Sequence, residues 1–361
     1  MDPALAELAD RIRAAAAQGT PLRIHGGGTK DFYGERLEGE LLDTRGLQGI
    51  VSYEPSELVV TVRAGTPLAE LEQVLAESGQ CLPFEPPHFA PGATVGGMVA
   101  AGLSGPARAS VGAVRDYILG LVLLNGRAEE LVFGGQVMKN VAGYDVSRLM
   151  AGALGTLGLI AEVSLKVLPV PPAEATLRFR IPQAEALERL NAWGGQPLPL
   201  NASCWEPSNG GALYLRLRGA VAAVEAACRS LGGDQLDTAG AAAEWNACRD
   251  HGMIWFTEGG ERDLWRLSVP QTARVLQLPE APLVEWHGAQ RWVRAQPADG
   301  HHVRQAALAA GGHATLFRSA RADAHDRMTH LAPPLAAIHE QLKLQFDPYR
   351  VFNRGRLYPH L

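Results

Sequence analysis

A stretch of nearly bare backbone is the first feature of this chain that could do chemistry. Residues 26–30 read Gly-Gly-Gly-Thr-Lys and follow a short predicted strand at 21–25. A loop without large side chains can wrap an anionic group by donating several backbone N–H groups to it. An isolated triple glycine is also typical of a flexible surface turn. The loop alone therefore leaves two interpretations open, an anion site or an exposed turn.

Two further segments are equally poor in side chains. Residues 84–104 begin with three prolines in eight positions, which hold the chain extended, and then turn to glycine and alanine. Residues 152–160 carry glycines at 152, 155 and 158, which equally favour close packing of a helix against a neighbour. Glycine-rich backbone allows a close approach. The three segments together predict a flat, phosphate-bearing cofactor held mainly by main-chain contacts.

Composition excludes several other classes of function. The 361 residues carry 38 acidic and 33 basic side chains, and this net charge of −5 argues against a nucleic-acid partner. The four cysteines lie far apart and predict neither a metal site nor a disulfide framework, which fits a reducing compartment. No secretory leader and no apolar run of about 18 residues is present, so we expect a cytoplasmic protein. No Gly-x-x-x-x-Gly-Lys-Ser/Thr loop occurs around the four lysines.

Hydrophobic periodicity predicts an α/β unit in the first half of the chain. A well-marked helix has Thr66 as its N-cap, Pro67 at its first position and Gly79 at its end. The other elements predicted here are a helix at 4–18 and strands at 21–25, 49–53, 58–63, 118–124, 129–133 and 159–168.

Prolines at 169, 171 and 172 mark a linker, after which the pattern changes. Strand, helix, two strands and a helix follow in order, which with one further strand is typical of a ferredoxin-like sandwich. The predicted ranges are 175–181, 185–193, 201–205, 212–218 and 221–231.

Motifs along the whole chain resemble a known flavoprotein superfamily. The segments that carry the likeness are Pro21–Lys30, Phe84–His88, Thr94–Gly102, Phe133–Asp145, Gly143–Ile160, Gly311–Thr315 and Phe346–Asn353. They resemble the FAD-binding domain of the vanillyl-alcohol-oxidase and p-cresol-methylhydroxylase (PCMH) superfamily, and within it the FAD-binding E subunits of bacterial glycolate oxidases. The resemblance implies an α+β fold with a two-subdomain PCMH-type FAD-binding domain at 1–170. It further implies a ferredoxin-like antiparallel cap at 173–330, and a C-terminal helix and tail at 331–361 that return to the flavin domain.

The resemblance implies FAD as the cofactor and assigns its contacts. Residues 25–30 would form the pyrophosphate loop. The segments 91–97 and 100–104 would lie along the pyrophosphate, ribityl chain and flavin, and residues 155–160 would line the adenine and ribose side. The implied FAD-binding residues are His25, Gly26, Gly27, Gly28, Thr29, Lys30, Pro91, Gly92, Ala93, Thr94, Gly96, Gly97, Ala101, Gly102, Ser104, Gly155, Gly158 and Ile160. Covalent members attach the flavin to a histidine at the place of Gly28, so the resemblance implies non-covalent FAD.

Candidate catalytic residues follow from the needs of 2-hydroxy acid oxidation. The reaction needs a base for the hydroxyl proton, a cation for the carboxylate and a hydride acceptor. His313 is a candidate base, and Lys139 or Arg318 a candidate cation, although a structural role is the commoner outcome for any one of the eleven histidines. Related subunits that oxidise D-2-hydroxy acids carry a histidine and acid cluster with metal-ligand spacing, which this sequence lacks, so we expect no metal. An alternative is that this chain relays electrons while a sister subunit does the chemistry.

The resemblance also implies partners. They are a sister FAD subunit and an iron–sulfur subunit of a glycolate oxidase complex, which acts on a small 2-hydroxy acid at the cytoplasmic face of the membrane. Membrane association would be peripheral and through these partners only. Two rival hypotheses remain open: a self-sufficient FAD-dependent oxidase of another hydroxy acid or polyol, and a flavin-free assembly scaffold.

Overall fold

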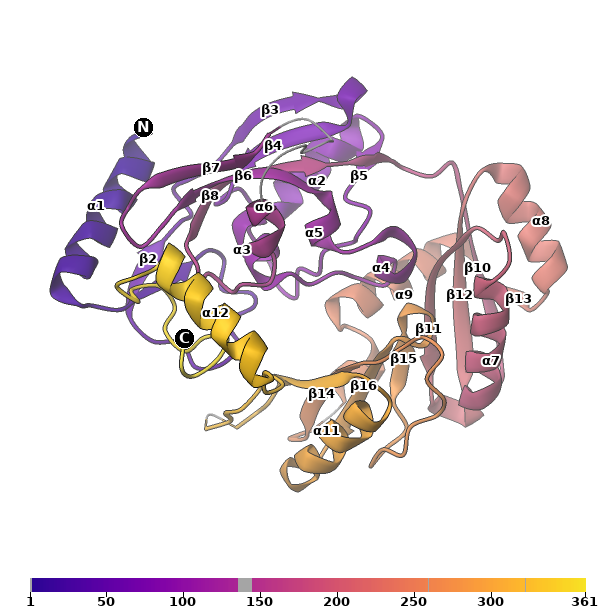
Figure 1. The fold of residues 1–361 in the computed structure, drawn as a ribbon. Helices are drawn as coiled ribbons and strands as arrows, with labels where there is room; N and C mark the ends of the chain where they lie inside the picture. The colour runs from indigo at the N-terminus through magenta and orange to yellow at the C-terminus, as the bar shows by residue number, and fades with distance from the viewer. Residues whose placement is uncertain (1, 136–144, 259, 322) are drawn as a thin grey trace. The chain divides into compact units, whose positions relative to one another are not determined.

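The computed structural model describes residues 2–135, 145–258, 260–321 and 323–361. Its contacts divide the chain into two compact units (Figure 1). The first consists of Met1–Leu103, Ala113–Pro169 and His330–Leu361, and the second of Ser104–Gly112 and Val170–Thr329. Each unit has its own sheets and its own buried cores. Helices combined with mainly antiparallel sheets confirm the predicted α+β class.

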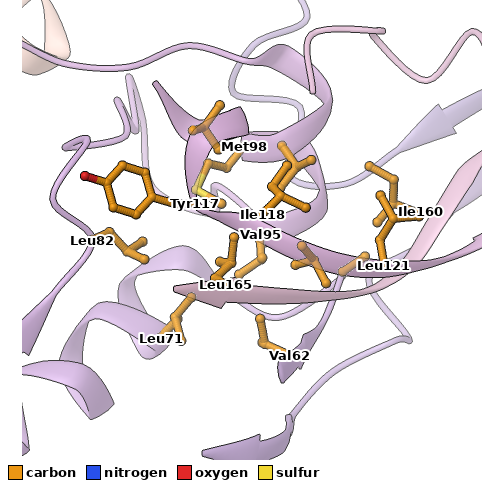
Figure 2. Close-up of a cluster of buried hydrophobic side chains, with 14 of the residues drawn as sticks. Val62, Leu71, Leu82, Val95, Met98, Tyr117, Ile118, Leu121, Ile160 and Leu165 are labelled. Carbon is orange, nitrogen blue, oxygen red and sulfur yellow. The ribbon is translucent and has the colours of Figure 1, made fainter. Parts of the chain in front are cut away.

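A five-stranded antiparallel sheet of order β3-β4-β8-β6-β7 forms the main layer of the first unit. Its strands and the helices of this layer are β3 (Ile50–Glu54), β4 (Val59–Arg63), β6 (Ile118–Leu124), β7 (Glu130–Gly134), β8 (Leu159–Lys166), α2 (Leu68–Glu77), α3 (Val95–Ala101), α5 (Val114–Tyr117) and α6 (Val146–Leu149). Strand residues such as Val62 and Leu165 are buried together with Leu71 of α2 and Met98 of α3 (Figure 2). Alternation along the strands places these side chains on the face that the helices cover.

A second core in the same unit joins the two ends of the chain. The helix α1 (Pro3–Gln18) presents a stripe of Leu5, Leu8 and Ile12, as its periodicity predicts. This stripe packs with the parallel pair β1 (Leu22–His25) and β2 (Glu40–Asp43), and with Phe352 of the C-terminal tail. The tail follows α12 (Pro333–Phe346). In the same unit β5 (Gln80–Cys81) forms a separate antiparallel pair with β9 (Leu168–Pro169).

The predicted N-cap of the second helix is wrong. α2 begins one residue later than expected, with Pro67 as the flanking residue and no side-chain cap. The Thr66 hydroxyl instead accepts a hydrogen bond from Gly49 N at 2.9 Å. The Thr66 hydroxyl, which the local pattern assigned to the helix N-terminus, is therefore bonded to Gly49, a residue distant in the sequence.

The second unit is built on an eight-stranded antiparallel sheet of order β13-β10-β12-β11-β15-β16-β14-β17. Its elements are α4 (Arg108–Val111), β10 (Ala173–Phe179), α7 (Gln183–Gly194), β11 (Leu200–Glu206), β12 (Ala212–Gly219), α8 (Val221–Leu231), β13 (Asp234–Gln235), α9 (Thr238–Asp250), α10 (Ile254–Thr257), β14 (Asp263–Ser268), β15 (Leu283–Glu285), β16 (Gln290–Ala295), α11 (Gly300–Ala309) and β17 (His313–Arg318).

This sheet contains the predicted ferredoxin-like order and a second copy of it. Strands β10 to β13 lie in the order fourth, first, third, second, with α7 and α8 as the crossovers. Strands β14 to β17 lie in the same order when the sheet is read from its opposite edge. The two halves meet where β11 pairs with β15. The repeat was not predicted, because its first crossover is an irregular segment rather than a helix.

A half-buried histidine fastens the segment Ser104–Gly112 to this sheet. The His287 backbone N–H donates to Ser203 Oγ (2.9 Å), and its ring nitrogens lie 3.0 Å from Ser203 Oγ and 2.9 Å from Ser110 Oγ. Trp286 and His287 both have a left-handed backbone, with φ of 53° and 54°. Such conformations persist only where the surroundings hold them.

Burial lowers the pKa of His287 to about 4, which predicts a pH dependence of stability. Between this value and the unfolded value near 6.5 the unfolded chain binds a proton that the folded chain does not. The contribution of His287 to stability is therefore complete above about pH 7 and is lost as the pH falls towards 4, by on the order of 2–3 kcal/mol. Denaturant unfolding of His287→Gln and the parent from pH 7 to 4 measures this. Parallel pH profiles for the two proteins would contradict the prediction.

Candidate functional site

A cavity of about 110 Å³ in the first unit brings the glycine-rich segments together. Its wall comes from β1 and the loop after it, from α3, from residues 154–160 and from the C-terminal tail. This volume suits the phosphate groups of a dinucleotide rather than all of it, since whole ligand pockets measure roughly 300–1,000 Å³. The cavity therefore corresponds to part of the predicted cofactor site.

The loop after β1 presents a row of free backbone donors. Within the described residues, the N–H groups of Gly26, Gly27, Gly28 and Thr29 have no hydrogen-bond acceptor. All four residues line the cavity. Partly buried amides without partners are rare in proteins and are the groups that bind phosphate in anion-binding loops. The loop thus fits the anion site and not the exposed turn.

The bare faces of most of these glycines are turned towards other protein segments. A side chain at Gly26 would clash with Thr94, and one at Gly27 with the carbonyl of Gly92. A Cβ at Gly96 would lie 2.7 Å from Ala64 Cβ, and one at Gly158 would lie 2.9 Å from the Leu123 side chain. These glycines are therefore required for segments of the chain to pack against each other.

Gly97 differs from its neighbours. A Cβ built there meets only the Thr94 hydroxyl, at 3.1 Å, and Gly97 lines the cavity. Gly97 is thus a position of α3 where the lack of a side chain leaves room in the cavity itself.

The cavity collects most of the residues that the sequence assigned to FAD. Those in its wall are Gly26, Gly27, Gly28, Thr29, Lys30, Thr94, Gly96, Gly97, Ala101, Gly155, Gly158 and Ile160. Those outside it are His25, Pro91, Gly92, Ala93, Gly102 and Ser104. Gly102 packs against Gly152, because a Cβ placed on Gly102 would lie 2.7 Å from the Gly152 backbone. Ser104 belongs to the second unit.

Sequence reasoning missed nine residues of the wall. They are Ile24, Asp31, Leu37, Thr44, Ala64, Ala100, Leu154, Asn353 and Arg356. Ile24, Ala100 and Leu154 lie inside segments that the sequence did single out, and the polar composition of the tail was a signal for the last two. Nothing local marks the remaining four.

The C-terminal tail supplies two polar side chains of the site, Asn353 and Arg356. Asn353 Oδ1 accepts from Ile24 N at 2.8 Å, and its Nδ2 donates to Leu154 O at 2.6 Å. Arg356 is 5% exposed, and its guanidinium donates to the carbonyl oxygens of Asp31 (2.8 Å), Tyr33 and Glu35. These bonds hold the segment after the glycine loop and place a buried positive charge beside the four free amides. Both features suit a bound pyrophosphate.

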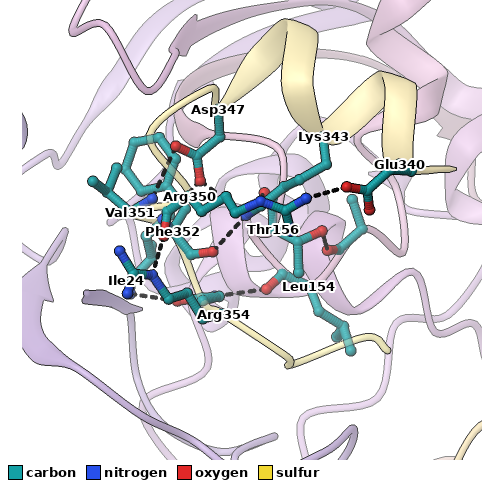
Figure 3. A network of polar contacts seen from close by, with 12 residues as sticks. Ile24, Leu154, Thr156, Glu340, Lys343, Asp347, Arg350, Val351, Phe352 and Arg354 are labelled. Atoms are coloured by element: carbon teal, nitrogen blue, oxygen red, sulfur yellow. Dashed lines mark hydrogen bonds and ion pairs between the residues drawn. The ribbon is translucent and has the colours of Figure 1, made fainter. Parts of the chain in front are cut away.

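A buried ion pair fixes the tail in turn (Figure 3). Lys343 Nζ donates to Asp347 Oδ2 (2.8 Å), Thr156 O (2.7 Å) and Phe352 O (2.8 Å). Asp347 also accepts from the backbone N–H groups of Val351 (3.0 Å) and Phe352 (2.8 Å). Neither charged side chain is exposed. Burial lowers the pKa of Lys343, and the neighbouring Asp347 opposes that shift.

Of the candidate catalytic residues, His313 and Arg318 belong to the second unit and do not line this cavity. His313 begins β17 in the second unit, pairs with Ser268 across the sheet and is exposed. Partial desolvation by the surrounding side chains lowers the pKa of His313, and the charge of Arg266 lowers it further. Lys139 lies outside the described residues. Arg318, at the end of β17, has its pKa lowered by burial.

Two kinds of feature are absent from the described ranges. They contain no group of three or more His, Cys, Asp or Glu side chains that could hold a metal ion. They also contain no helix with the length and apolar character needed to cross a bilayer.

Comparisons with known proteins agree with the geometry of the first unit. Residues 4–134 match the family of FAD binding domains. The glycolate oxidase subunit GlcE of Escherichia coli K12 is 43% identical over 354 residues, which cover 98% of this chain and 97% of that protein. The glycolate oxidase subunit GlcD of Bacillus subtilis 168 is 30% identical over 128 residues, or 36% of this chain and 27% of that protein.

A solved structure shows the same fold at low sequence identity. An alkyldihydroxyacetonephosphate synthase superimposes with a TM-score of 0.67 over 96% of this chain and 75% of that chain, at 15% identity. Identity of 43% along nearly the full length of both proteins is decisive for the family. The chain carries an FAD binding domain and belongs to the family of the glycolate oxidase subunit GlcE.

Proposed function

We propose that this chain is the FAD-binding subunit of a glycolate dehydrogenase or oxidase complex and holds its FAD without a covalent bond. The observation that carries the proposal is the row of four free amides at Gly26–Thr29 beside the buried Arg356, in a chain that matches GlcE from end to end. The proposed limits are 1–170 for the flavin domain, 173–330 for the cap and 331–361 for the returning helix and tail.

The residues of the first unit would bind and orient the cofactor. The amides of Gly26–Thr29 donate to the pyrophosphate, and Arg356 offsets its charge while holding the loop in place. Asn353 links β1 to the 154–158 segment and so fixes the width of the site. When bound, FAD supplies two-electron oxidation of a hydroxyl-bearing carbon. Gly28 occupies the place of the histidine that bonds to the flavin in covalent members. Because glycine has no side chain to form that bond, we expect non-covalent binding.

The proposal includes partners and a place of action. The relatives named GlcE and GlcD are subunits of glycolate oxidase, which supports a sister flavin subunit for this chain. An iron–sulfur subunit, a cytoplasmic location and attachment to the membrane through partners follow from the resemblance of the sequence. Whether His313 and Lys139 act on substrate here or the sister subunit does the chemistry is decided by the assay below.

The test is to purify the full chain alone and with co-expressed partner subunits. We expect close to one flavin per chain, released into the supernatant by acid precipitation, and glycolate-dependent reduction of an artificial acceptor only with the partners. Flavin that stays with the precipitate would contradict non-covalent binding, and a colourless protein would favour the scaffold. Turnover by the chain alone would favour the self-sufficient oxidase.

A further inference from the structure

The second unit contains a cavity of about 760 Å³, larger than the one in the first unit. This volume lies in the range of small-molecule sites, roughly 300–1,000 Å³. One wall is the sheet at β10, β11, β12 and β16, and the other is α9, α10 and the residues that follow them. All of its lining residues belong to the second unit.

The cavity exists because the two faces of the sheet are used differently. One face is apolar and carries Leu177, Leu215 and Trp205 in the core beneath α7 and α8. Residues that alternate with these point to the other face. There α9 is anchored by Trp245, whose Nε1 donates to Thr176 Oγ1 at 3.0 Å. A single helix cannot cover this polar face, and the uncovered part is the cavity.

One wall carries an arginine that the protein leaves without an ion-pair partner. The Arg294 guanidinium lies over the Trp255 ring, 4.7 Å from its centroid. Its Nε is buried without a hydrogen-bond partner, and within the described ranges no carboxylate forms a salt bridge with it. The adjacent Arg262 pairs with Glu280 instead. Burial lowers the pKa of Arg294 and the charge of Arg262 lowers it further, while the charges of Glu280 and Glu258 oppose the shift.

The lining of the cavity combines aromatic and apolar side chains with charged ones. Trp245, Trp255, Met253 and Leu236 all face the cavity. The acidic residues in the wall are Glu206, Glu244 and Glu258. Glu206 accepts a hydrogen bond from Ser208 Oγ at 2.7 Å. A flat ring stacks favourably on such side chains, and an anionic group pairs with an arginine most strongly where water is excluded.

The two cysteines of the cavity do not make it a reactive site. Cys204 and Cys248 are both buried and hydrogen-bond to each other, and Cys248 Sγ also donates to Glu285 Oε1 at 3.2 Å. The neighbouring Cys204 raises the pKa of Cys248, and burial and the charge of Glu285 raise it further. The pKa of Cys204 is lowered by Cys248, but burial and the charge of Glu285 outweigh this and leave it raised. Neutral buried thiols are poor nucleophiles. The chemistry of the cavity is therefore that of binding.

We propose that this cavity binds a small organic anion with a flat apolar body, such as an aromatic carboxylate or sulfonate. Its anionic group pairs with Arg294, and its ring lies against Trp255 and Met253. The site is separate from the residues assigned to FAD and does not depend on the proposed redox function.

The test uses 8-anilinonaphthalene-1-sulfonate, a flat sulfonate whose fluorescence reports binding, with the full-length flavin-loaded protein. We expect saturable binding of one probe per chain and displacement by naphthalene-2-carboxylate. Arg294→Gln should weaken binding at least about tenfold through loss of a charged hydrogen bond. Arg294→Lys keeps the charge and should retain part of the affinity, and Met253→Trp should abolish binding by filling the cavity.

Arg274→Gln, at an exposed position outside the cavity, is the matched control and should bind like the parent protein. Flavin content and near-UV circular dichroism confirm that each variant is folded. Unchanged binding in both Arg294→Gln and Met253→Trp would overturn the proposal, as would the absence of saturable binding in the parent protein.

Discussion

Replacing Lys343 by methionine should lower the free energy of unfolding of the first unit by about 3–5 kcal/mol. Methionine preserves the apolar stem but leaves Asp347 buried without its cation. It also removes the donor to the carbonyl oxygens of Thr156 and Phe352. Removing one partner of a buried pair is costly because the remaining charge stays desolvated. Denaturant unfolding followed by flavin fluorescence measures the change in the first unit.

The same variant should also release FAD more readily. The ion pair holds the turn that leads to Asn353 and Arg356, and these two residues bind β1, Leu154 and the segment after the glycine loop. A loosened tail would therefore open the cofactor site from one side. We expect a raised dissociation constant for FAD in titrations of the flavin-stripped protein.

The matched control is Glu340→Gln. Glu340 forms an ion pair with Arg350 on the same helix and tail, but both side chains are about one-third exposed. Partly exposed pairs of this kind contribute about 0–1 kcal/mol. Equal losses of stability for Lys343→Met and Glu340→Gln would show that the buried pair has no special role.

Gly97→Val should weaken FAD binding by about 10- to 100-fold while the protein stays folded. The added side chain meets only the Thr94 hydroxyl within the protein, so it extends into the cavity. Overfilling a packed site costs about 1–3 kcal/mol, which corresponds to this range of affinity. The dissociation constant for FAD, measured by quenching of flavin fluorescence, gives the effect directly.

Two further variants make this test specific. Gly97→Ala should have a smaller effect in the same direction, because it adds a single methyl group. Gly46→Val, at an exposed glycine with open space around it, should keep full affinity. Gly96 is unsuitable as a probe, since a side chain there would press on Ala64 and disturb the fold itself. Full flavin content in Gly97→Val would place the cofactor elsewhere.

The sequence by itself predicted the elements whose signals are local. The stripe of Leu5, Leu8 and Ile12 defined α1, and the βαββα order after the prolines defined the first half of the second sheet. The spacing of residues along one helix or strand is enough for such predictions. The motifs also identified the family and its cofactor, because glycine-rich loops are recognisable without any knowledge of their surroundings.

The tertiary structure alone decided which group meets which over long separations in the chain. Asn353 bonds Ile24 across 329 residues, and Arg356 bonds Glu35 across 321. The glycines illustrate the same limit: the sequence marks a missing side chain, but only packing shows that Gly27 makes room for Gly92 and Gly97 for the cavity. The local pattern predicted one ferredoxin-like unit, whereas pairing of β11 with β15 joins two such units in one sheet. Each outcome depends on contacts between distant segments, which no local pattern encodes.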